Sequence, residues 1–324
     1  MIIVTGGAGL IGSAVVWQLN GRGVDDILIV DHNPNGDKDG NLAPLKYSQY
    51  IDKSDFLQKL QKGEYGDEIE AIIHLGACTD TTETDKEYLY QNNFDYTRKL
   101  ASYAVEKNIR FVYASSAATY GNGDKGYSDD EKLIPALEPL NEYARSKQMF
   151  DLWAIENSLM DKIAGLKYFN IFGPNEGHKG EMRSMVAKAF EQIWSSSEVR
   201  LFKSRREEYE DGEQQRDFLY VKDAAEITLF FFDNPGLNGI YNVGSGKAES
   251  WNVLINALFE ALDLEPKILY IDMPENIREQ YQYHTKAETQ KLIDSGYRKE
   301  PTPLGEAVKD YVTNYLIPGS HLGS

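Results

Sequence analysis

The 324-residue chain contains a single cysteine, Cys78, so no disulfide can form within it. It therefore lacks the cysteine framework of small secreted domains and fits a reducing compartment. Its five histidines are scattered without the spacing of metal ligands, and we expect no metal site. Basic residues are also few: 34 Lys and Arg stand against 51 Asp and Glu, a net charge of −17. We expect no nucleic-acid or membrane partner, and any anionic ligand must be held by local cations and backbone amides.

Long hydrophobic runs are scarce, and only the N-terminus resembles one. Residues 1–21 carry no charge and are numerous enough to span a bilayer. However, this stretch contains Gly6, Gly7, Gly9 and Gly12 in one short segment, and no basic segment precedes it. A strand, a glycine turn and a helix explain it better. We predict neither a membrane segment nor a signal peptide, and we expect a cytoplasmic protein.

Short apolar runs alternate with helical patterns through the first half of the chain. Strands are predicted at 1–4, 27–30, 71–74, 111–114 and 163–168, and later at 217–221, 239–243 and 267–271. Helices are predicted at 14–19, 55–60, 87–105 and 143–159, and later at 224–232, 251–262 and 304–315. This alternation indicates right-handed βαβ units and therefore an α/β fold of the Rossmann type, with a doubly wound parallel sheet.

The alternation becomes irregular after about residue 170, where the loops lengthen. We therefore expect a dinucleotide-binding domain over 1–170, to which part of 217–245 returns. A smaller interleaved substrate-binding lobe would comprise 171–216 and 246–317. The last residues, 318–324, are expected to form a disordered tail.

A glycine-rich turn, Gly6-Gly7-Ala8-Gly9-Leu10-Ile11-Gly12, follows the first predicted strand and opens the first predicted helix. Gly6 permits a tight turn, Gly9 lets backbone amides approach a pyrophosphate, and Gly12 lets helix and strand pack closely. The anion would rest at the positive end of the helix. The pattern predicts dinucleotide binding, although glycine-rich turns also occur for purely structural reasons.

Asp31 closes the second predicted strand, at the position where an acidic residue accepts the ribose 2′-hydroxyl of NAD. Lys38 and Lys53 follow, where the 2′-phosphate of NADP would need cations. Asp37 and Asp39 flank Lys38, so a solvated charged loop is the other explanation. The residues alone leave the choice between NADP and NAD open.

Tyr143 and Lys147 are spaced so that they share one face of a predicted helix. An ammonium close to a phenol favours the phenolate, which lowers the pKa of the phenol and makes it a better base. Ser115, Ser116 and Thr119 follow the fourth predicted strand, at the sheet edge where ligands bind. A hydroxyl there, with Ser116 as our candidate, can hydrogen-bond the reacting oxygen. The same hydroxyls can instead cap a helix.

The glycine turn, the strand-end serines and the YxxxK pair resemble the extended short-chain dehydrogenase/reductase superfamily that acts on nucleotide sugars. Other segments resemble one family within it, the ADP-L-glycero-D-manno-heptose 6-epimerases. These segments are Gly76-Ala77-Cys78-Thr79, Asn92-Asn93, residues 115–121 and, above all, YFNIFGPNEGHKGEMR at 168–183. The likeness is nearly collinear from residue 1 to about 317, with one additional polar stretch around 205–213. GPNEGHKG is the signal specific to this family.

The resemblance implies an enzyme that inverts C6″ of ADP-D-glycero-β-D-manno-heptose, in the cytoplasmic route to the heptose of the lipopolysaccharide inner core. It also implies one tightly bound NADP, or NAD, per subunit, and a homo-oligomer, which in this family is a pentamer. The catalytic pair would be Tyr143 and Lys147, joined by Lys179. Positions that match cofactor contacts are Leu10, Ile11, Asp31, His32, Lys38, Lys53, Leu75, Gly76, Ala77, Cys78, Thr79, Asn92 and Ile171.

Positions that match substrate contacts of the family are Asn170, Glu181, Lys188, Phe202 with the three residues after it, Arg216 and Tyr281. Some members carry other residues at Glu181, at Lys188 and within 202–205. These departures leave the catalytic assignment unaffected and concern only the contacts to sugar and diphosphate. Tyr281 would either stack on the adenine or simply pack.

Inversion at C6″ requires a transient ketone, because this carbon has no acidic hydrogen. The nicotinamide takes up hydride and gives it back on the same side of its ring. The keto group therefore has to turn over between oxidation of C6″ and reduction of the ketone. Its oxygen then needs a second proton partner. Tyr143 is the first, and we predict Lys179 as the second, unless it is a plain diphosphate clamp. Arg183 and Arg216 are the other candidates for binding diphosphate, unless they pair with neighbouring acids.

Two rival functions lie in the same superfamily, a UDP-sugar 4-epimerase and a dTDP-sugar 4,6-dehydratase. The dehydratase needs carboxylates directly after the strand-end hydroxyl, but Ala117 and Ala118 follow Ser116. A 4-epimerase needs one base only, so an essential Lys179 would argue against it. A non-catalytic dinucleotide-binding sensor is the rival of another class, and it has no use for the serine, tyrosine and lysine together.

Overall fold

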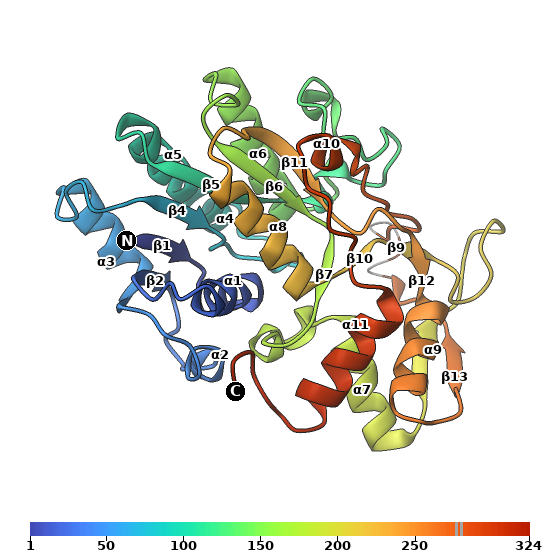
Figure 1. The fold of residues 1–324 in the computed structure, drawn as a ribbon. Helices are drawn as coiled ribbons and strands as arrows, with labels where there is room; N and C mark the ends of the chain where they lie inside the picture. The colour runs from blue at the N-terminus through green and yellow to red at the C-terminus, as the bar shows by residue number, and fades with distance from the viewer. Residues whose placement is uncertain (276–277, 279–280) are drawn as a thin grey trace.

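A seven-stranded parallel sheet forms the centre of the computed structural model, which describes residues 1–275, 278 and 281–324 (Figure 1). The strand order is β11-β6-β5-β4-β1-β2-β3. Its strands are β1 (Ile2–Thr5), β2 (Ile27–Asp31), β3 (Gln49–Asp52), β4 (Ala71–His74), β5 (Arg110–Ser116), β6 (Ala164–Tyr168) and β11 (Gly239–Val243). The strand order reverses between β1 and β4, and ligands of such sheets bind at this point, outside the carboxyl ends of the strands.

Alternate residues of β1 belong to two different hydrophobic clusters. Ile2 and Val4 pack into one cluster and Ile3 into the other, because successive side chains of a strand point to opposite faces. The helices are α1 (Leu10–Gly21) and α8 (Val221–Asp233) on the first face, and α3 (Lys53–Gln61), α5 (Tyr96–Glu106) and α6 (Glu142–Glu156) on the second. Helices cover both faces of a parallel sheet, so the predicted doubly wound fold of the Rossmann type is confirmed.

The uncharged N-terminal stretch forms β1, the glycine turn and α1, as its pattern predicted. The side chains of Ala14, Val15, Val16 and Leu19 are fully buried. Packing of α1 against the sheet and against its neighbour α8 therefore accounts for the lack of charge. No helix in the described part of the chain is long and apolar enough to cross a bilayer.

The helix predicted over 87–105 consists of three pieces. They are α4 (Lys86–Leu89), the π-helical turn η1 (Tyr90–Asp95) and α5. π-helical turns are frequent at functional sites, because the inserted residue redirects the side chains around it. Here the turn contains Asn92 and Asn93.

Three short strand pairs lie outside the central sheet. They are β7 (Asn170–Phe172) with β10 (Phe218–Tyr220), β8 (Val199–Phe202) with β13 (Ile268–Ile271), and β9 (Gln215–Arg216) with β12 (Glu249–Ser250). Figure 1 shows β13 grouped with α7 (Met185–Ser196), α9 (Trp251–Ala261) and α11 (Leu304–Tyr311), away from the central sheet. The sequence patterns did not indicate α7 or β8. β8 (VRLF) is interrupted by the charged Arg200, so it does not form the continuous apolar run by which the other strands were recognised.

The chain returns to the central sheet after residue 220. β11 pairs with β6 in a parallel register, and α8 packs against α1. This part of the chain therefore lies with the sheet. The division into a dinucleotide-binding domain and a substrate-binding lobe stays a prediction.

The C-terminal residues 318–324 are docked, and the prediction of a disordered tail is wrong. Leu322 is fully buried in the cluster that contains α1. Its amide donates a hydrogen bond to Asn175 Oδ1 at 3.1 Å. A single buried leucine with a satisfied backbone is enough to anchor so short a segment, and this partner is invisible in the local sequence.

Candidate active site

A cavity of about 720 Å³ opens at the carboxyl edge of the sheet, with walls from the glycine turn, the loop after β4, β5, α6, β7 and the short helix η4 (Gly177–Met182). The predicted site residues that line it are Gly6, Gly9, Leu10, Ile11, Gly12, Asp31, Lys38, Leu75, Gly76, Ala77, Cys78, Thr79, Ser116, Tyr143, Lys147, Asn170, Ile171, Lys179 and Arg183. The predicted site residues outside its lining are His32, Lys53, Asn92, Glu181, Lys188, Phe202, Arg216 and Tyr281. Folding thus joins both halves of the chain in one site.

The glycine turn forms a cradle that a larger residue would fill. Gly6 has a φ of +67°, and a Cβ there would lie 2.6 Å from the Gly76 nitrogen. A Cβ on Gly12 would lie 2.1 Å from the Gly6 carbonyl oxygen. Gly9 precedes α1, and no side chain of the described residues caps this helix. The first-turn amides and the positive helix end remain for an anion, which fits the pyrophosphate of a dinucleotide.

The carboxylate of Asp31, at the end of β2, is engaged on both oxygens. One accepts from the Ala8 amide at 2.9 Å, and the other accepts from Lys38 Nζ at 2.7 Å. Lys53 is half-buried nearby and donates to Asn92 Oδ1. Burial lowers the pKa of Lys53, while the charge of Asp31 opposes this. Two cations therefore flank the end of the cavity where the adenosine ribose of a dinucleotide is expected.

Tyr143 lies in the first turn of α6 with its ring buried. Burial raises the pKa of the phenol, and a hydrogen bond with Ser116 only partly offsets this. The lowering of this pKa that we expected from Lys147 is not found in the protein alone, where burial dominates and the opposing influence comes from Ser116. Ser116 also accepts from the Ala118 amide at 3.1 Å and so caps η2 (Ala117–Tyr120). The serine thus fills both roles considered above, capping a helix and contacting Tyr143.

Lys147 lies one helical turn beyond Tyr143 and is also buried. Its Nζ donates to the Ala114 carbonyl of β5 at 2.9 Å, and burial lowers its pKa to about 8. Asp151, fully buried on the next turn, accepts from Ser115 and from Lys167, each at 2.7 Å. This network ties α6 to β5 and β6 and fixes the predicted pair relative to the strand ends.

Asn93 is a site residue that the sequence reasoning missed. Its buried Nδ2 donates to the Cys78 carbonyl at 3.0 Å and to Ser146 Oγ at 2.9 Å, and its Oδ1 accepts from the Cys78 amide at 2.8 Å. It thereby holds the loop after β4 against α6. We noted Asn92-Asn93 only as a family likeness and assigned Asn92 alone. The missed signal is two consecutive asparagines, which are poor helix formers, within a predicted helix.

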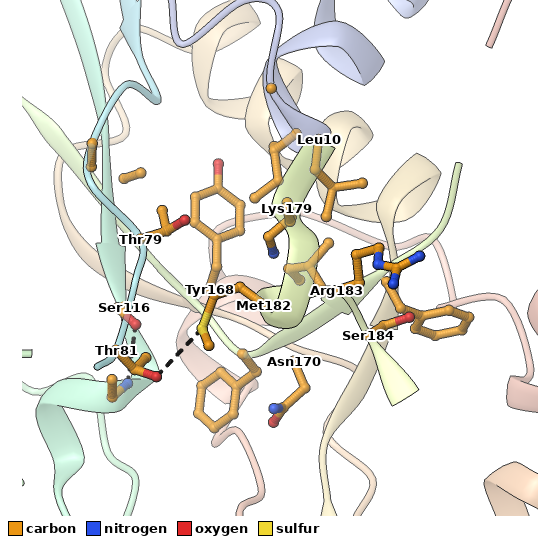
Figure 2. A pocket seen from close by; sticks show the side chains of 18 of the residues that line it. Leu10, Thr79, Thr81, Ser116, Tyr168, Asn170, Lys179, Met182, Arg183 and Ser184 are labelled. Carbon is orange, nitrogen blue, oxygen red and sulfur yellow. Dashed lines mark hydrogen bonds between the residues drawn. The ribbon is translucent and has the colours of Figure 1, made fainter. Parts of the chain in front are cut away.

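Lys179 projects into the cavity from η4 (Figure 2). Burial lowers the pKa of its ammonium, and the charge of Glu176 opposes this. Beside it, Thr81 Oγ1 donates to Met182 Sδ at 3.7 Å, the contact marked by a dashed line in Figure 2. The loop after β4 and the helix that carries Lys179 therefore meet at the cavity. Tyr143 and Lys179 enter the same cavity from different elements.

Three charged candidates for substrate contact are paired within the protein. Arg183 donates through Nη2 to Glu191 at 3.1 Å and through Nε to the Gly180 carbonyl at 2.8 Å. Glu181 and Lys188 form an ion pair at 3.6 Å, with the Glu181 side chain 90% exposed. For Arg183 the structure thus contains the pairing with a neighbouring acid that we gave as the alternative to phosphate binding.

Arg216 is buried, only 6% exposed, and pairs with no carboxylate among the described residues. Its Nη1 donates to the Gln215 carbonyl at 2.8 Å. Its guanidinium lies over the rings of Trp251 and Tyr281, 5.6 and 5.2 Å from their centroids, and Phe202 packs edge-on against Tyr281. Burial lowers the pKa of Arg216. Such a cation is unfavourable without an anion nearby, and Trp251 also lines the cavity.

Of the remaining predicted contact residues, Asn170 and Ile171 line the cavity and His32 does not. Asn170 and Ile171 belong to β7 and line the cavity, with Asn170 Oδ1 accepting from Thr285 at 3.4 Å. His32 instead points outward, 55% exposed, and pairs with Asp52 at 2.9 Å. The structure therefore brings Asn170 and Ile171 to the cavity and leaves His32 at its edge.

Comparison with known proteins agrees with this site. Residues 2–244 match the NAD dependent epimerase/dehydratase family. An ADP-L-glycero-D-manno-heptose-6-epimerase of Nitratidesulfovibrio vulgaris is 48% identical over 98% of this chain and 98% of its own. The crystal structure of the Helicobacter pylori ADP-L-glycero-D-manno-heptose-6-epimerase has a TM-score of 0.81 at 28% identity, covering 97% of this chain and 95% of that one.

Similarity of fold extends further than this family. A UDP-N-acetylglucosamine 4-epimerase of Methanobrevibacter ruminantium has a TM-score of 0.81 at 23% identity, covering 98% of each chain. The fold alone thus does not distinguish these activities, whereas identity over the full length does distinguish the families. The chain belongs to the NAD dependent epimerase/dehydratase family and, within it, to the ADP-L-glycero-D-manno-heptose-6-epimerases.

Proposed function

We propose that this enzyme inverts C6″ of ADP-D-glycero-β-D-manno-heptose to give ADP-L-glycero-β-D-manno-heptose, for the inner-core heptose of lipopolysaccharide. Membership of the family supports the substrate and the reaction. The observation that carries the mechanism is that Tyr143 and Lys179 enter one cavity from α6 and η4. An oxygen that turns over between two steps needs two proton partners, and this cavity offers both.

The cofactor is a nicotinamide dinucleotide, which the glycine cradle and the basic residues beside Asp31 fit. The chemistry it supplies when bound is removal of hydride from C6″ and return of hydride to the other face of the ketone. Tyr143 exchanges the hydroxyl proton in one orientation, with Ser116 hydrogen-bonding the same oxygen. Lys179 exchanges the proton in the other orientation, and the lowered pKa of its ammonium eases loss of that proton.

The rival functions are less well supported by the same residues. A 4-epimerase needs a single proton partner, which leaves the partly buried Lys179 without a role in proton transfer. A 4,6-dehydratase needs carboxylates after the strand-end hydroxyl, where this chain has Ala117 and Ala118 in η2. A sensor without catalysis does not require two titratable groups in one cavity.

Incubation of the purified protein with ADP-D-glycero-β-D-manno-heptose, followed by NMR of the heptose signals, tests the proposed function. We expect interconversion of the two epimers. UDP-galactose and a dTDP-hexose serve as the comparison substrates. Turnover of either, without conversion of the ADP-heptose, would overturn the proposal in favour of the corresponding rival.

We further propose NADP as the cofactor, because Lys38 already neutralises Asp31 and Lys53 adds a second cation. The double variant Lys38→Ala/Lys53→Ala loses two charge-assisted hydrogen bonds to the 2′-phosphate. It should therefore bind NADP about 100-fold or more weakly than the wild type. Binding of NAD should change by less than about threefold, since NAD lacks this phosphate. Calorimetry on the cofactor-stripped protein measures both, with the exposed Lys59→Ala as control. Equal effects on the two cofactors would reject the preference.

Arg216 is proposed to bind the diphosphate of the substrate. Replacing it by methionine should raise KM for the ADP-sugar by about 100-fold, the usual value of a lost hydrogen bond between charged groups, and change kcat much less. Arg216→Lys keeps the charge but loses the planar guanidinium group. Its KM should therefore lie between that of the wild type and that of the methionine variant. The methionine variant should not unfold at a lower temperature, because it removes a buried charge that has no carboxylate partner among the described residues. An unchanged KM in a folded Arg216→Met protein would contradict this role.

The assignment of the other site residues, a homo-oligomer, its pentameric form and a cytoplasmic location remain proposals that rest on the family. Sedimentation equilibrium of the purified protein measures the number of subunits directly. A monomer at micromolar concentration would contradict the proposed assembly. One tightly bound cofactor per subunit should co-purify, because an enzyme that returns its own hydride gains nothing by releasing the dinucleotide.

A further inference from the structure

Two buried asparagines connect the loop that carries Lys179 to the glycine turn. Asn41 belongs to the short helix α2 (Asp39–Leu42), and Asn175 precedes η4. Their side chains are 3% and 5% exposed. We call Asn41 and Asn175 the asparagine pair. Neither residue has a role in the proposed mechanism.

Asn41 joins three separate segments through its amide nitrogen. Its Nδ2 donates to the Ala8 carbonyl of the glycine turn and to the Asn175 carbonyl, each at 2.9 Å. It also lies 3.3 Å from Nδ1 of His178, the residue directly before Lys179. The two carbonyl oxygens can only accept, and they take both hydrogens of the amide nitrogen, so these contacts settle the orientation of the Asn41 amide. Burial lowers the pKa of His178 to about 4, with a further lowering from the charge of Lys179, so the ring beside Asn41 is neutral at neutral pH.

Asn175 completes the connection from the other side. Its Nδ2 donates to Ser13 Oγ of α1 at 2.9 Å. Its backbone has a φ of +75°, in the left-handed region that asparagine tolerates better than most residues. A backbone held in this region directs the chain abruptly into η4, and it persists only where surrounding contacts maintain it.

The C-terminal tail closes the asparagine pair from outside. His321 Nδ1 lies 3.1 Å from Asn41 Oδ1 and 3.2 Å from Asn175 Oδ1, and since both oxygens accept, Nδ1 is the protonated nitrogen. The ring rests on α2 so closely that a Cβ on Gly40 would lie 2.6 Å from its Nε2. The next residue, Leu322, is the buried anchor of the tail. Figure 1 shows the C-terminus beside α2, far from α2 in the sequence.

We propose that Asn41, held in place by His321, is a positioning residue for Lys179. It fixes the loop from Asn175 to Lys179 onto the glycine turn, so that the amine keeps a constant place relative to the nucleotide site. The inference rests on the proposed function, in which Lys179 exchanges a proton in one of the two orientations. Because the hydrogen bonds reach the loop beside Lys179 and not α6, loss of Asn41 impairs the Lys179 step and spares the Tyr143 step.

The test compares Asn41→Ala and His321→Ala with a matched control, Asn20→Ala. Asn20 also bridges two segments, donating to the Lys46 carbonyl at 2.8 Å and to the Val24 carbonyl at 3.0 Å, but it has no contact with η4. Each holoenzyme is mixed with each of the two epimers, and formation of reduced nicotinamide is followed in a single turnover. Lys179→Met identifies which epimer depends on Lys179.

We expect Asn41→Ala to slow oxidation of that epimer by about 10- to 100-fold, as a small misplacement of a reacting group does. The other epimer should be oxidised within about twofold of the wild-type rate, and His321→Ala should show the same asymmetry more weakly. Asn20→Ala should slow the oxidation of neither epimer. In the protein stripped of cofactor, amides of residues 176–184 should exchange hydrogen about tenfold faster in Asn41→Ala, and those of β6 should not change.

Equal slowing of both epimers, or unchanged exchange over 176–184, would overturn the inference while leaving the proposed function intact. If Asn41→Ala does not fold, the rates of His321→Ala with the two epimers provide the test instead. This variant removes only a partly exposed ring from the edge of the asparagine pair. Lys179→Met itself separates the two proposals. If that variant shows no asymmetry between the epimers, the role of Lys179 fails, and the positioning role of Asn41 fails with it.

Discussion

Replacing Tyr143 by phenylalanine is expected to lower kcat for epimerisation by about 10²- to 10⁴-fold, the usual contribution of a positioned proton acceptor. The substitution removes only the hydroxyl group, so the buried ring keeps its packing. In a single turnover, oxidation of the epimer served by Tyr143 should fall most, because Lys179 serves the other. The wild-type kcat/KM should rise with pH, since burial raises the pKa of this phenol and the phenolate has to form.

Tyr103→Phe, on α5 and away from the cavity, is the matched control and should retain full activity. Circular dichroism and the amount of bound nucleotide should be unchanged in both variants. The rise of kcat/KM with pH should disappear in Tyr143→Phe alone. Near-normal turnover of that variant, with its nucleotide in place, would refute the assignment of Tyr143 as the first proton partner.

Replacing Lys179 by methionine is expected to reduce epimerisation by a similar factor, about 10²- to 10⁴-fold. The distinguishing result is asymmetric. One epimer should still be oxidised rapidly through Tyr143, so that ketone accumulates and inverted product does not, whereas the other epimer should be oxidised slowly. Methionine keeps most of the length and apolar stem of lysine, and burial of this site favours an uncharged side chain. The variant should therefore fold normally.

Lys267→Met, at a lysine whose side chain is 65% exposed, is the control and should leave both steps unchanged. A simple diphosphate clamp predicts a different outcome for Lys179→Met, namely a higher KM with both epimers oxidised at equal rates when saturated. That outcome would favour the rival function of a UDP-sugar 4-epimerase, since Tyr143 would then be the single proton partner.

The charge around the cavity is opposite in sign to the net charge of the whole chain. At a net charge of −17, the protein attracts no anion in general. Folding nevertheless collects Lys38, Lys147, Lys179 and Arg183 around one cavity, beside the positive end of α1. An anionic nucleotide sugar therefore finds a local positive site within a protein that repels other polyanions.

Several parts of the site could be predicted from the sequence because they depend on local chemistry. Gly6, Gly9 and Gly12 precede a helix directly after a strand, so their cradle follows from backbone sterics alone. Tyr143 and Lys147 share a helix face, which their spacing determines once a helix is assigned. Both reach the cavity as expected.

Other parts could not be predicted because they depend on partners distant in the chain. The pairing of Arg183 with Glu191, the aromatic rings around Arg216 and the bridging role of Asn93 each require knowledge of which segments meet. The tail was wrongly expected to be disordered, since nothing in residues 318–324 reveals that Leu322 enters a cluster built by α1.

The amino-acid sequence by itself determined the alternation of strands and helices, the glycine cradle, the family and the chemical groups available for catalysis. These follow from side-chain periodicity and from residue types at short spacing, which act over one turn or one strand. Only the tertiary structure decided which cations pair with neighbouring acids, in which direction the pKa of Tyr143 moves, and that the C-terminal residues His321 and Leu322 contact Asn175. Burial and charge pairing produce these properties, and both exist only after remote segments have packed together.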